Sequence, residues 1–284
     1  MKGTVELLSS GMYTTIQDGG RFGYSKYGVP KSGAMDLRSF FLANAILNND
    51  ENSAVIEWTV VPPVLKFLGD TIVSITGVIC DPYLNDVRCK MNSQIKIVNG
   101  DVLKFKNVRN GVYGYVGIFS GFLSEFILGS RSQYNQITKF SRLFRNDMIT
   151  YNSVSRFSTS NSLISNTVFW EELDSLHVYK GPEFDMLSDM QKDVLLHHDF
   201  TISDIRNRMA ISLEESLEND LSSMLSSPVL PGTVQLTPSG RLIVLMRDCQ
   251  TTGGYPRILQ LTKESINVIA QKRTGDQIGF TIVD

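Results

Sequence analysis

Short runs of β-branched and aromatic residues, separated by Gly, Asn and Asp, recur along most of this 284-residue chain. Such runs favour the pleated backbone of a strand, and the residues between them are typical of turns. Long helices do not alternate with the strands, which argues against a parallel α/β sheet and for sheets or barrels. The pattern predicts strands at residues 71–79, 94–108, 111–119, 175–182, 232–246 and 277–283. Within 232–246, Pro-Ser-Gly separates two apolar runs and predicts a hairpin, with Gly240 available for a positive φ.

Three segments have a helical periodicity instead. Residues 33–49, 184–198 and 262–276 each place apolar side chains on one stripe, and we predict a short helix in each. Thr262 is the expected N-cap of the last helix and Gly275 its expected stop. The predicted fold class is therefore mainly β, a β-rich α+β chain with a few short helices.

Composition limits the classes of function. Hydrophobic residues make up 42% of the chain and charged residues 20%, with a net charge of −2, so binding to nucleic acid or to an anionic membrane through charge is not expected. The sequence has no apolar run long enough to span a membrane, and its first residues lack the apolar core of a signal peptide. Three cysteines without metal-type spacing suggest reduced thiols in a cytoplasmic protein.

A stretch rich in Ser, Asn and Thr at residues 150–167 predicts a linker or surface excursion. We place a boundary there, between an N-terminal β-rich lobe at 1–160 and a C-terminal lobe at 161–284. A second polar stretch, residues 214–229, is acidic and serine-rich and is expected to be an exposed helix or loop. No internal repeat of fixed period is present in the sequence.

The first candidate site is the glycine-rich segment 14–36, which directly precedes a predicted helix. Such loops can bind anions through free backbone N–H groups, but the spacings of the known nucleotide-binding loops are missing here. The segment could instead line a ligand site, or it could be an ordered loop in which Asp18 and Arg21 form an internal ion pair. The residues alone leave these alternatives open.

Two further stretches carry polar groups beside strands. Glu57 lies inside the apolar run "SAVIEWT", so it either faces solvent or is buried and paired, as carboxylates in reactive sites often are. The stretch "RDCQTTGGYPRI" at 247–258 could form a tight turn, a phosphate cradle or the lip of a binding site. The histidines do not converge with cysteines in metal-site spacing, and the sequence has no G-x-S-x-G nucleophile motif, so no metal site is predicted.

Both loops resemble one known family. "TTIQDGGRFGYSKYGVPKSGAMD" is similar to the opening signature of the allophanate hydrolase subunit 2 (KipA-like) family, and "VQLTPSGRLIVLMRDCQTTGGYP" is similar to its C-terminal signature. "LGSRSQY" matches the family's central motif, and the resemblance spans residues 10 to 284. It implies cyclophilin-like β-barrel architecture, including the lobe at 161–284.

The resemblance also implies a function. Free-standing bacterial members are assigned as the C component of ATP-dependent 5-oxoprolinase, which opens 5-oxo-L-proline to L-glutamate together with the A and B components. Relatives fused into urea amidolyase form part of a biotin-dependent carboxyltransferase. Others are described as antagonists of KipI, a histidine-kinase inhibitor. We expect the first activity here, with ATP used by the assembled complex and the A component and a KipI-like B component as partners; the other two remain alternatives.

The chain departs from the family pattern in its centre. "GIFSGFLSEFILGSRS" replaces a small-residue stretch, "KFSRLFRND" at 139–147 replaces a glycine-rich one, and Ala210 stands where glycine is usual. The central loop is therefore bulkier, and the resemblance does not carry a substrate role to Arg131 or Ser132.

The polar residues of the matched motifs are the predicted site. We expect the two loops to form two walls of one site for a small-molecule substrate, with cationic and amide donors around developing negative charge. The predicted catalytic residues are Asp18, Arg21, Asp36 and Glu57, with Arg21 lining the site and the three carboxylates as positioning or acid–base groups. The predicted substrate-binding residues are Gln17, Ser32, Gln250, Thr251, Thr252, Gly253, Gly254 and Tyr255.

Overall fold

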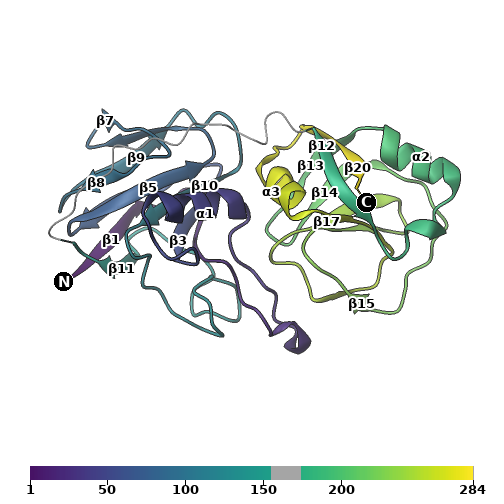
Figure 1. The fold of residues 1–284 in the computed structure, drawn as a ribbon, viewed down its shortest axis with the longest axis horizontal. Helices are drawn as coiled ribbons and strands as arrows, with labels where there is room; N and C mark the ends of the chain where they lie inside the picture. Colours follow the sequence, from purple (N-terminus) through teal and green to yellow (C-terminus); the bar gives the residue numbers. More distant parts are fainter. Residues whose placement is uncertain (155–173, 284) are drawn as a thin grey trace. The chain divides into compact units, whose positions relative to one another are not determined.

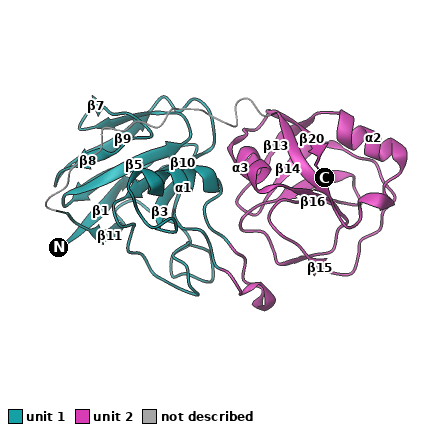
Figure 2. Cartoon of the chain, viewed as in Figure 1, with its two compact units in different colours: residues 1–21, 32–167 teal, residues 22–31, 168–284 magenta. Residues whose placement is uncertain are grey.

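A computed structural model describes residues 1–154 and 174–283 of the chain. These residues form two compact units, shown in different colours in Figure 2. Unit 1 contains residues Met1–Arg21 and Ser32–Thr167, and unit 2 contains residues Phe22–Lys31 and Val168–Asp284. The boundary that we predicted between residues 160 and 161 lies outside the described residues.

Unit 1 is built from two antiparallel sheets (Figure 1). The six-stranded sheet has the order β11 (Met148–Asn152), β1 (Lys2–Ser9), β4 (Val64–Leu68), β9 (Val102–Lys106), β6 (Asp81–Leu84) and β7 (Val87–Arg88). The five-stranded sheet has the order β2 (Tyr13–Gln17), β3 (Val55–Thr59), β10 (Tyr113–Ile118), β5 (Thr71–Gly77) and β8 (Ile95–Ile97). Apolar side chains of both sheets form one buried core cluster.

The five-stranded sheet is also covered on the face that points away from this core. Helix α1 (Leu37–Ile46) packs against both strands, and short polar side chains of β5 donate hydrogen bonds to its carbonyls. The Ser74 hydroxyl reaches Ala43 O at 2.7 Å, and the Thr76 hydroxyl reaches Ser39 O at 2.7 Å. Strand β10 is consequently buried at every position, without the alternation of a half-exposed strand.

Unit 2 is a closed barrel of seven strands with a two-stranded ribbon beside it (Figure 1). Only β12 and β20 pair in parallel within the described barrel; its other neighbours are antiparallel. The prediction of a mainly β chain with a barrel is thereby confirmed. The barrel order is β12 (Ser175–Lys180), β19 (Arg257–Leu261), β16 (Thr233–Leu236), β17 (Arg241–Leu245), β14 (Ala210–Ser216), β13 (Phe200–Arg206) and β20 (Gln277–Ile282). The ribbon pairs β15 (Ser227–Pro228) with β18 (Thr252–Gly253).

One predicted strand is in fact a pair of strands. Residues 94–108 divide into β8 and β9, because the chain turns at Gly100, whose φ of 96° is left-handed and favours glycine. Residues 232–246 form the predicted hairpin, in which β16 and β17 pair antiparallel through a turn at Gly240. The acidic stretch 214–229 is mostly irregular between β14 and β15, a loop rather than a helix.

The helices in unit 2 begin at polar caps. Helix α2 (Asp189–His197) starts later than predicted, because Ser188 forms a capping box with Gln191, and residues Phe184–Met186 form a separate 3-10 turn. Helix α3 (Lys263–Gln271) starts at its predicted cap, where the Thr262 side chain accepts from Ser265 N. The predicted stop at Gly275 is wrong, since the helix ends at Gln271. No helix in the described residues is long and apolar enough to cross a membrane.

We expect Gly114→Ala in β10 to destabilise the protein by about 1–3 kcal/mol through overpacking. A Cβ at this position would lie 2.3 Å from the ring of Trp58, which is fully buried. Urea unfolding measures the change, with Gly254→Ala as the control because its added Cβ would meet only Met224 O at 3.3 Å. Equal stability of the two variants would show that the Trp58 ring can move away.

Candidate functional site

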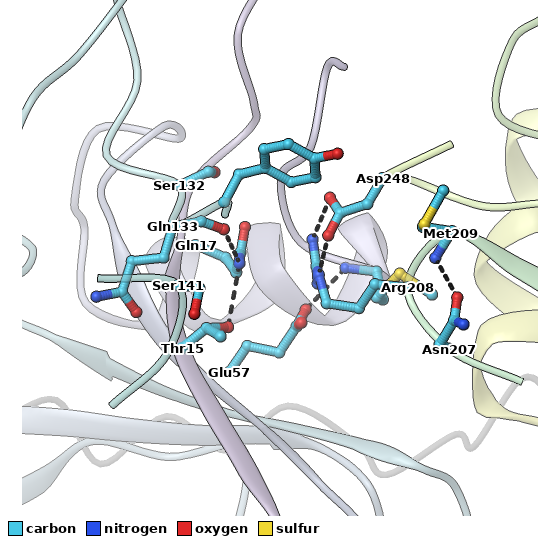
Figure 3. Close-up of polar contacts among 12 residues, drawn as sticks. Thr15, Gln17, Glu57, Ser132, Gln133, Ser141, Asn207, Arg208, Met209 and Asp248 are labelled. Atoms are coloured by element: carbon cyan, nitrogen blue, oxygen red, sulfur yellow. Dashed lines mark hydrogen bonds and ion pairs between the residues drawn. The ribbon is translucent and has the colours of Figure 1, made fainter. Parts of the chain in front are cut away.

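Gln17 is the last residue of β2, and its side chain is fixed by hydrogen bonds inside unit 1. Its amide nitrogen donates to the Thr15 hydroxyl at 3.1 Å and to Gln133 O at 3.3 Å (Figure 3). Main-chain contacts hold the two segments together, because Gln133 N donates to Ile16 O at 2.9 Å. The other amide atom, Gln17 Oε1, is buried and has no partner among the described residues, so it can accept a hydrogen bond from a ligand.

Asp18 anchors the central loop of unit 1. Its carboxylate accepts hydrogen bonds from the Ser130 and Ser132 hydroxyls at 2.6 and 2.7 Å. It also accepts from Arg131 N at 2.6 Å and from Gly20 N at 2.8 Å. Four charge-assisted hydrogen bonds occupy its oxygens, and the whole residue is buried. This geometry suits a carboxylate that positions two loops.

The glycine pair after Asp18 does not present free N–H groups to an anion. Gly19 N donates to the Asn52 side chain at 2.7 Å, and Gly20 N donates to Asp18. A phosphate cradle requires such groups to point at the ligand, so the structure does not support this alternative for the loop. Arg21 follows, buried, and its guanidinium donates to the Ser132 carbonyl.

Glu57 belongs to a second buried network in unit 1. It is only 2% exposed, so the alternative that placed it on a solvent face is wrong. Its Oε2 accepts from Tyr115 OH at 2.9 Å and from Met35 N at 2.7 Å. The Tyr115 oxygen in turn accepts from Asp36 N at 2.8 Å, and the Asp36 carboxylate caps α1 through Ser39 N and the Ser39 hydroxyl.

Tyr115 is the residue of this network that the sequence analysis missed. Burial, followed by the charges of Glu57 and Asp36, raises the pKa of its phenol well above the usual value. The phenol therefore stays protonated and remains a hydrogen-bond donor to Glu57. A tyrosine inside a wholly apolar strand requires such a partner, and this signal was present in "GVYGYVGIF".

Ser32 completes the candidate site in unit 1. It is 1% exposed and has a left-handed backbone with φ of 54°, which is uncommon for a residue other than glycine. Its hydroxyl is buried and has no partner among the described residues. Strained backbone and an unsatisfied polar group together are typical of functional positions.

The second loop lies in unit 2 and is largely accessible. Thr252 and Gly253 pair with Ser227 and Pro228 in the two-stranded ribbon, and Tyr255 is 39% exposed. A Cβ on Gly253 would lie 2.5 Å from Gln235 Nε2, so a side chain at this position would displace the Gln235 amide.

Gln235 and Cys249 are buried at this loop, and they differ in the chemistry that they can offer to a ligand. Gln235 is 2% exposed, and its Nε2 has no partner among the described residues, so it is a donor available to a ligand. Burial raises the pKa of the Cys249 thiol to about 12, and the thiol therefore stays protonated at neutral pH. Cys249 is consequently unsuited to act as a thiolate nucleophile.

Two ion pairs fix the ends of this loop. Arg208 binds Asp248 in a bidentate pair at 2.7 and 3.1 Å, and both residues are buried (Figure 3). Arg257 binds Glu183 through both guanidinium and backbone N–H groups, and these hydrogen bonds lower the pKa of the Glu183 carboxyl. The residues between Asp248 and Arg257 are therefore held at both ends.

The predicted site residues fall into two groups. Asp18, Arg21, Asp36, Glu57, Gln17 and Ser32 all lie in unit 1, and Gln250, Thr251, Thr252, Gly253, Gly254 and Tyr255 all lie in unit 2. Each group is a cluster in its own unit, and the arrangement of both loops as two walls of one site stays a prediction. Across the ranges that the structure describes, no three His, Cys, Asp or Glu side chains come together as metal ligands.

Comparison with known proteins identifies the family. The sequence profile of the carboxyltransferase domain, subdomain A and B, matches residues 27–282. The chain belongs to this carboxyltransferase-domain family. The protein is also 28% identical to the C component of 5-oxoprolinase from Escherichia coli K12 over 282 residues, which cover 97% of this chain and 90% of that protein. The resemblance inferred from the two motifs is confirmed.

Two other relatives are longer than this carboxyltransferase-domain protein. Urea amidolyase of Lachancea kluyveri is 41% identical over 130 residues, covering 45% of this chain and 7% of that protein. A crystal structure of the protein designated TTHA0988 superposes with a TM-score of 0.88 at 25% identity, covering 98% of this chain and 56% of that chain. The chain thus spans about half of that structure, which has the same fold.

We expect Tyr115→Phe to lower stability by about 2 kcal/mol at pH 8, because Glu57 loses a buried donor and Asp36 N loses its acceptor. The raised pKa of Tyr115 means that the folded state keeps a proton that the unfolded state loses above about pH 10. The stabilisation that the protonated Tyr115 phenol gives to the folded state is fully present below about pH 10, and it is lost as the pH rises further. Urea unfolding from about pH 8 to 11 should show the gap between the wild type and the variant narrowing above about pH 10. A constant gap would contradict the assignment.

Proposed function

We propose that the protein is the C component of an ATP-dependent 5-oxoprolinase, which opens 5-oxo-L-proline to L-glutamate together with the A and B components. Near full-length similarity to the C component of a bacterial 5-oxoprolinase supports this. The observation that carries the proposal is the pair of buried polar atoms without partners among the described residues, Gln17 Oε1 and Ser32 Oγ, on the motif that also carries Arg21. Unsatisfied groups of this kind are costly unless a ligand or water binds them.

These groups match the hydrogen-bonding pattern of a lactam. A lactam presents one N–H donor and one carbonyl acceptor, and Gln17 Oε1 would accept from the N–H. The Arg21 guanidinium and the Ser32 hydroxyl would stabilise negative charge that develops on the carbonyl oxygen. Gln17 donates to the carbonyl of Gln133, and Arg21 donates to the neighbouring carbonyl of Ser132. These adjacent contacts support a shared role of the Gln17 and Arg21 side chains in one site.

The carboxylates take a positioning role in this proposal. Asp18 holds the segment that Gln17 and Arg21 bind, and its oxygens are already occupied. Glu57 and Asp36 fix the entry to α1 through Tyr115 and Met35 N. Thr252, which is exposed in unit 2, is proposed as a further substrate contact because its motif matches the family signature.

ATP would be consumed by the assembled complex, where it supplies the driving force for opening a stable amide. The glycine pair in this chain does not fit a phosphate group, because its N–H groups are used by Asn52 and Asp18. We propose the A component and a KipI-like B component as partners, in the cytoplasm, where the free cysteines Cys80, Cys89 and Cys249 would stay reduced.

The family gives a second candidate function. A component of a biotin-dependent carboxyltransferase is favoured by the family profile and by the identity of 41% to part of a urea amidolyase. This candidate requires binding of a biotinylated carrier, which a pull-down with biotinylated and unmodified carrier tests. Binding that depends on the biotin would support it over the lactam hydrolase.

We expect Arg21→Ala to lower ATP-dependent cleavage of 5-oxo-L-proline by about 10²-fold or more in the complex reconstituted with the A and B components, because a donor to developing charge is lost. Thr252→Ala should also abolish most of the activity. Arg145→Ala, at an exposed position, is the control and should leave activity unchanged. Full activity of the Arg21 and Thr252 variants would overturn the site assignment.

Co-purification of each variant with the B component separates a catalytic defect from an assembly defect. If the wild-type chain binds the B component but never supports cleavage, the alternative of a non-catalytic KipI-binding antagonist gains support instead. Thermal unfolding of each variant confirms that it is folded.

A further inference from the structure

Unit 1 contains a pocket of about 460 Å³ that the proposed function does not use. This volume lies within the range of small-molecule sites. Ile16 of β2, Ile149 of β11 and the buried Leu143 supply apolar lining. Ser124, Arg131 and Lys139 supply polar lining. The pocket thus combines an apolar surface with two cations.

The segment 130–133, which Asp18 anchors, also contributes to the lining of the pocket. Ser130 and Ser132 direct their hydroxyls onto Asp18, whereas Arg131 and Gln133, which alternate with them, line the pocket. Alternation of this kind is expected of extended chain, in which successive side chains point to opposite sides. The same short segment therefore has two faces with separate contacts.

The two cations lining the pocket have no carboxylate partner among the residues that the structure describes. The Arg131 guanidinium donates to the Ser124 carbonyl and lies over the Phe126 ring at 5.3 Å. The Lys139 ammonium lies over the Phe140 ring at 5.2 Å. Both positive charges are thus held in place by an aromatic ring and remain available to an anion.

The two lining carboxylates accept backbone hydrogen bonds. Glu125 accepts from Lys139 N at 2.9 Å, and Asp147 accepts from Phe144 N at 2.8 Å. The Ser124 hydroxyl, in contrast, is buried and has no partner among the described residues. A ligand oxygen placed between Ser124 and Arg131 would satisfy this hydroxyl and one cation together.

We propose that this pocket binds a small carboxylic acid with an apolar body. The carboxylate binds Arg131 and the Ser124 hydroxyl, and the apolar body packs on Ile16, Leu143 and Ile149. A dianion such as phosphate is a poorer match, because Glu125 and Asp147 also line the pocket. The proposal is independent of the proposed function.

Part of the lining comes from the segment in which this chain departs from the family pattern. Lys139, Phe140, Leu143 and Asp147 all belong to "KFSRLFRND", which has lost the glycines usual in the family.

Benzoate is a suitable probe, with benzamide as its uncharged counterpart and inorganic phosphate as the dianion control. We expect saturable binding of benzoate to the full chain by calorimetry, with weaker or no binding of benzamide and phosphate. Arg131→Met should weaken benzoate binding by about tenfold or more, as expected for the loss of a charge-assisted hydrogen bond. Ser124→Ala should weaken it by about threefold to tenfold, since the hydroxyl carries no charge of its own and contributes less than the guanidinium. Arg145→Met, on the same loop but outside the pocket, should leave binding unchanged.

The methyl resonances of Ile16, Leu143 and Ile149 provide a second readout, because they should shift on titration with benzoate and not with phosphate. The proposal is overturned if benzoate does not bind saturably, if it binds Arg131→Met as tightly as the wild type, or if benzamide binds equally well. Unfolding curves establish that both pocket variants are folded.

Discussion

The Asp18 carboxylate holds together the parts of unit 1 on which the candidate site depends. Three of its four hydrogen bonds join the loop after β2 to residues 130–132, which come from a distant part of the chain, and the fourth is accepted from Gly20 N within the loop. Gln17 and Arg21 bind carbonyls of the same distant segment. Because these contacts are buried, removing the carboxylate would leave several polar groups unsatisfied at once. The geometry of the site thus follows from one residue whose oxygens are already occupied.

A second constraint acts on the other end of the same loop. The sheet of β3, β10 and β5 is covered by α1, so Glu57 and Tyr115 are enclosed and must satisfy each other. Their network fixes Met35 and Asp36, where the loop enters the helix. The loop is therefore held by buried carboxylates at both ends, and Ser32, with its unsatisfied hydroxyl, lies between them.

Local sequence signals predicted local structure well. The strand patterns, the hairpin turn at Gly240 and the N-cap at Thr262 depend on neighbouring residues, and each was visible in the sequence. The stop of α3 was misplaced because Gly275 belongs to the turn before β20 and not to the helix end. Glu57 was ambiguous, since period-two alternation assumes one exposed face and this sheet has none at β3.

Long-range contacts were beyond such signals. The family motifs located Gln17, Asp18 and Arg21, but not the partners that decide what each can do. The occupied oxygens of Asp18 and the open acceptor at Gln17 Oε1 depend on residues 130–133, whose side chains no local pattern connects to β2. The pocket was likewise invisible, because it forms between distant segments that include β2 and β11.

The alternation along residues 130–133 has a consequence for how related sequences can vary. One extended segment serves Asp18 with its even positions and the pocket with its odd ones. An insertion or deletion of a single residue inside it would exchange the two sets, turning Arg131 toward the Asp18 carboxylate and a serine toward the pocket. Length changes of two residues would preserve both faces. We therefore expect related proteins to differ in this segment by an even number of residues and not by an odd number. The backbone thereby couples the evolution of the two sites.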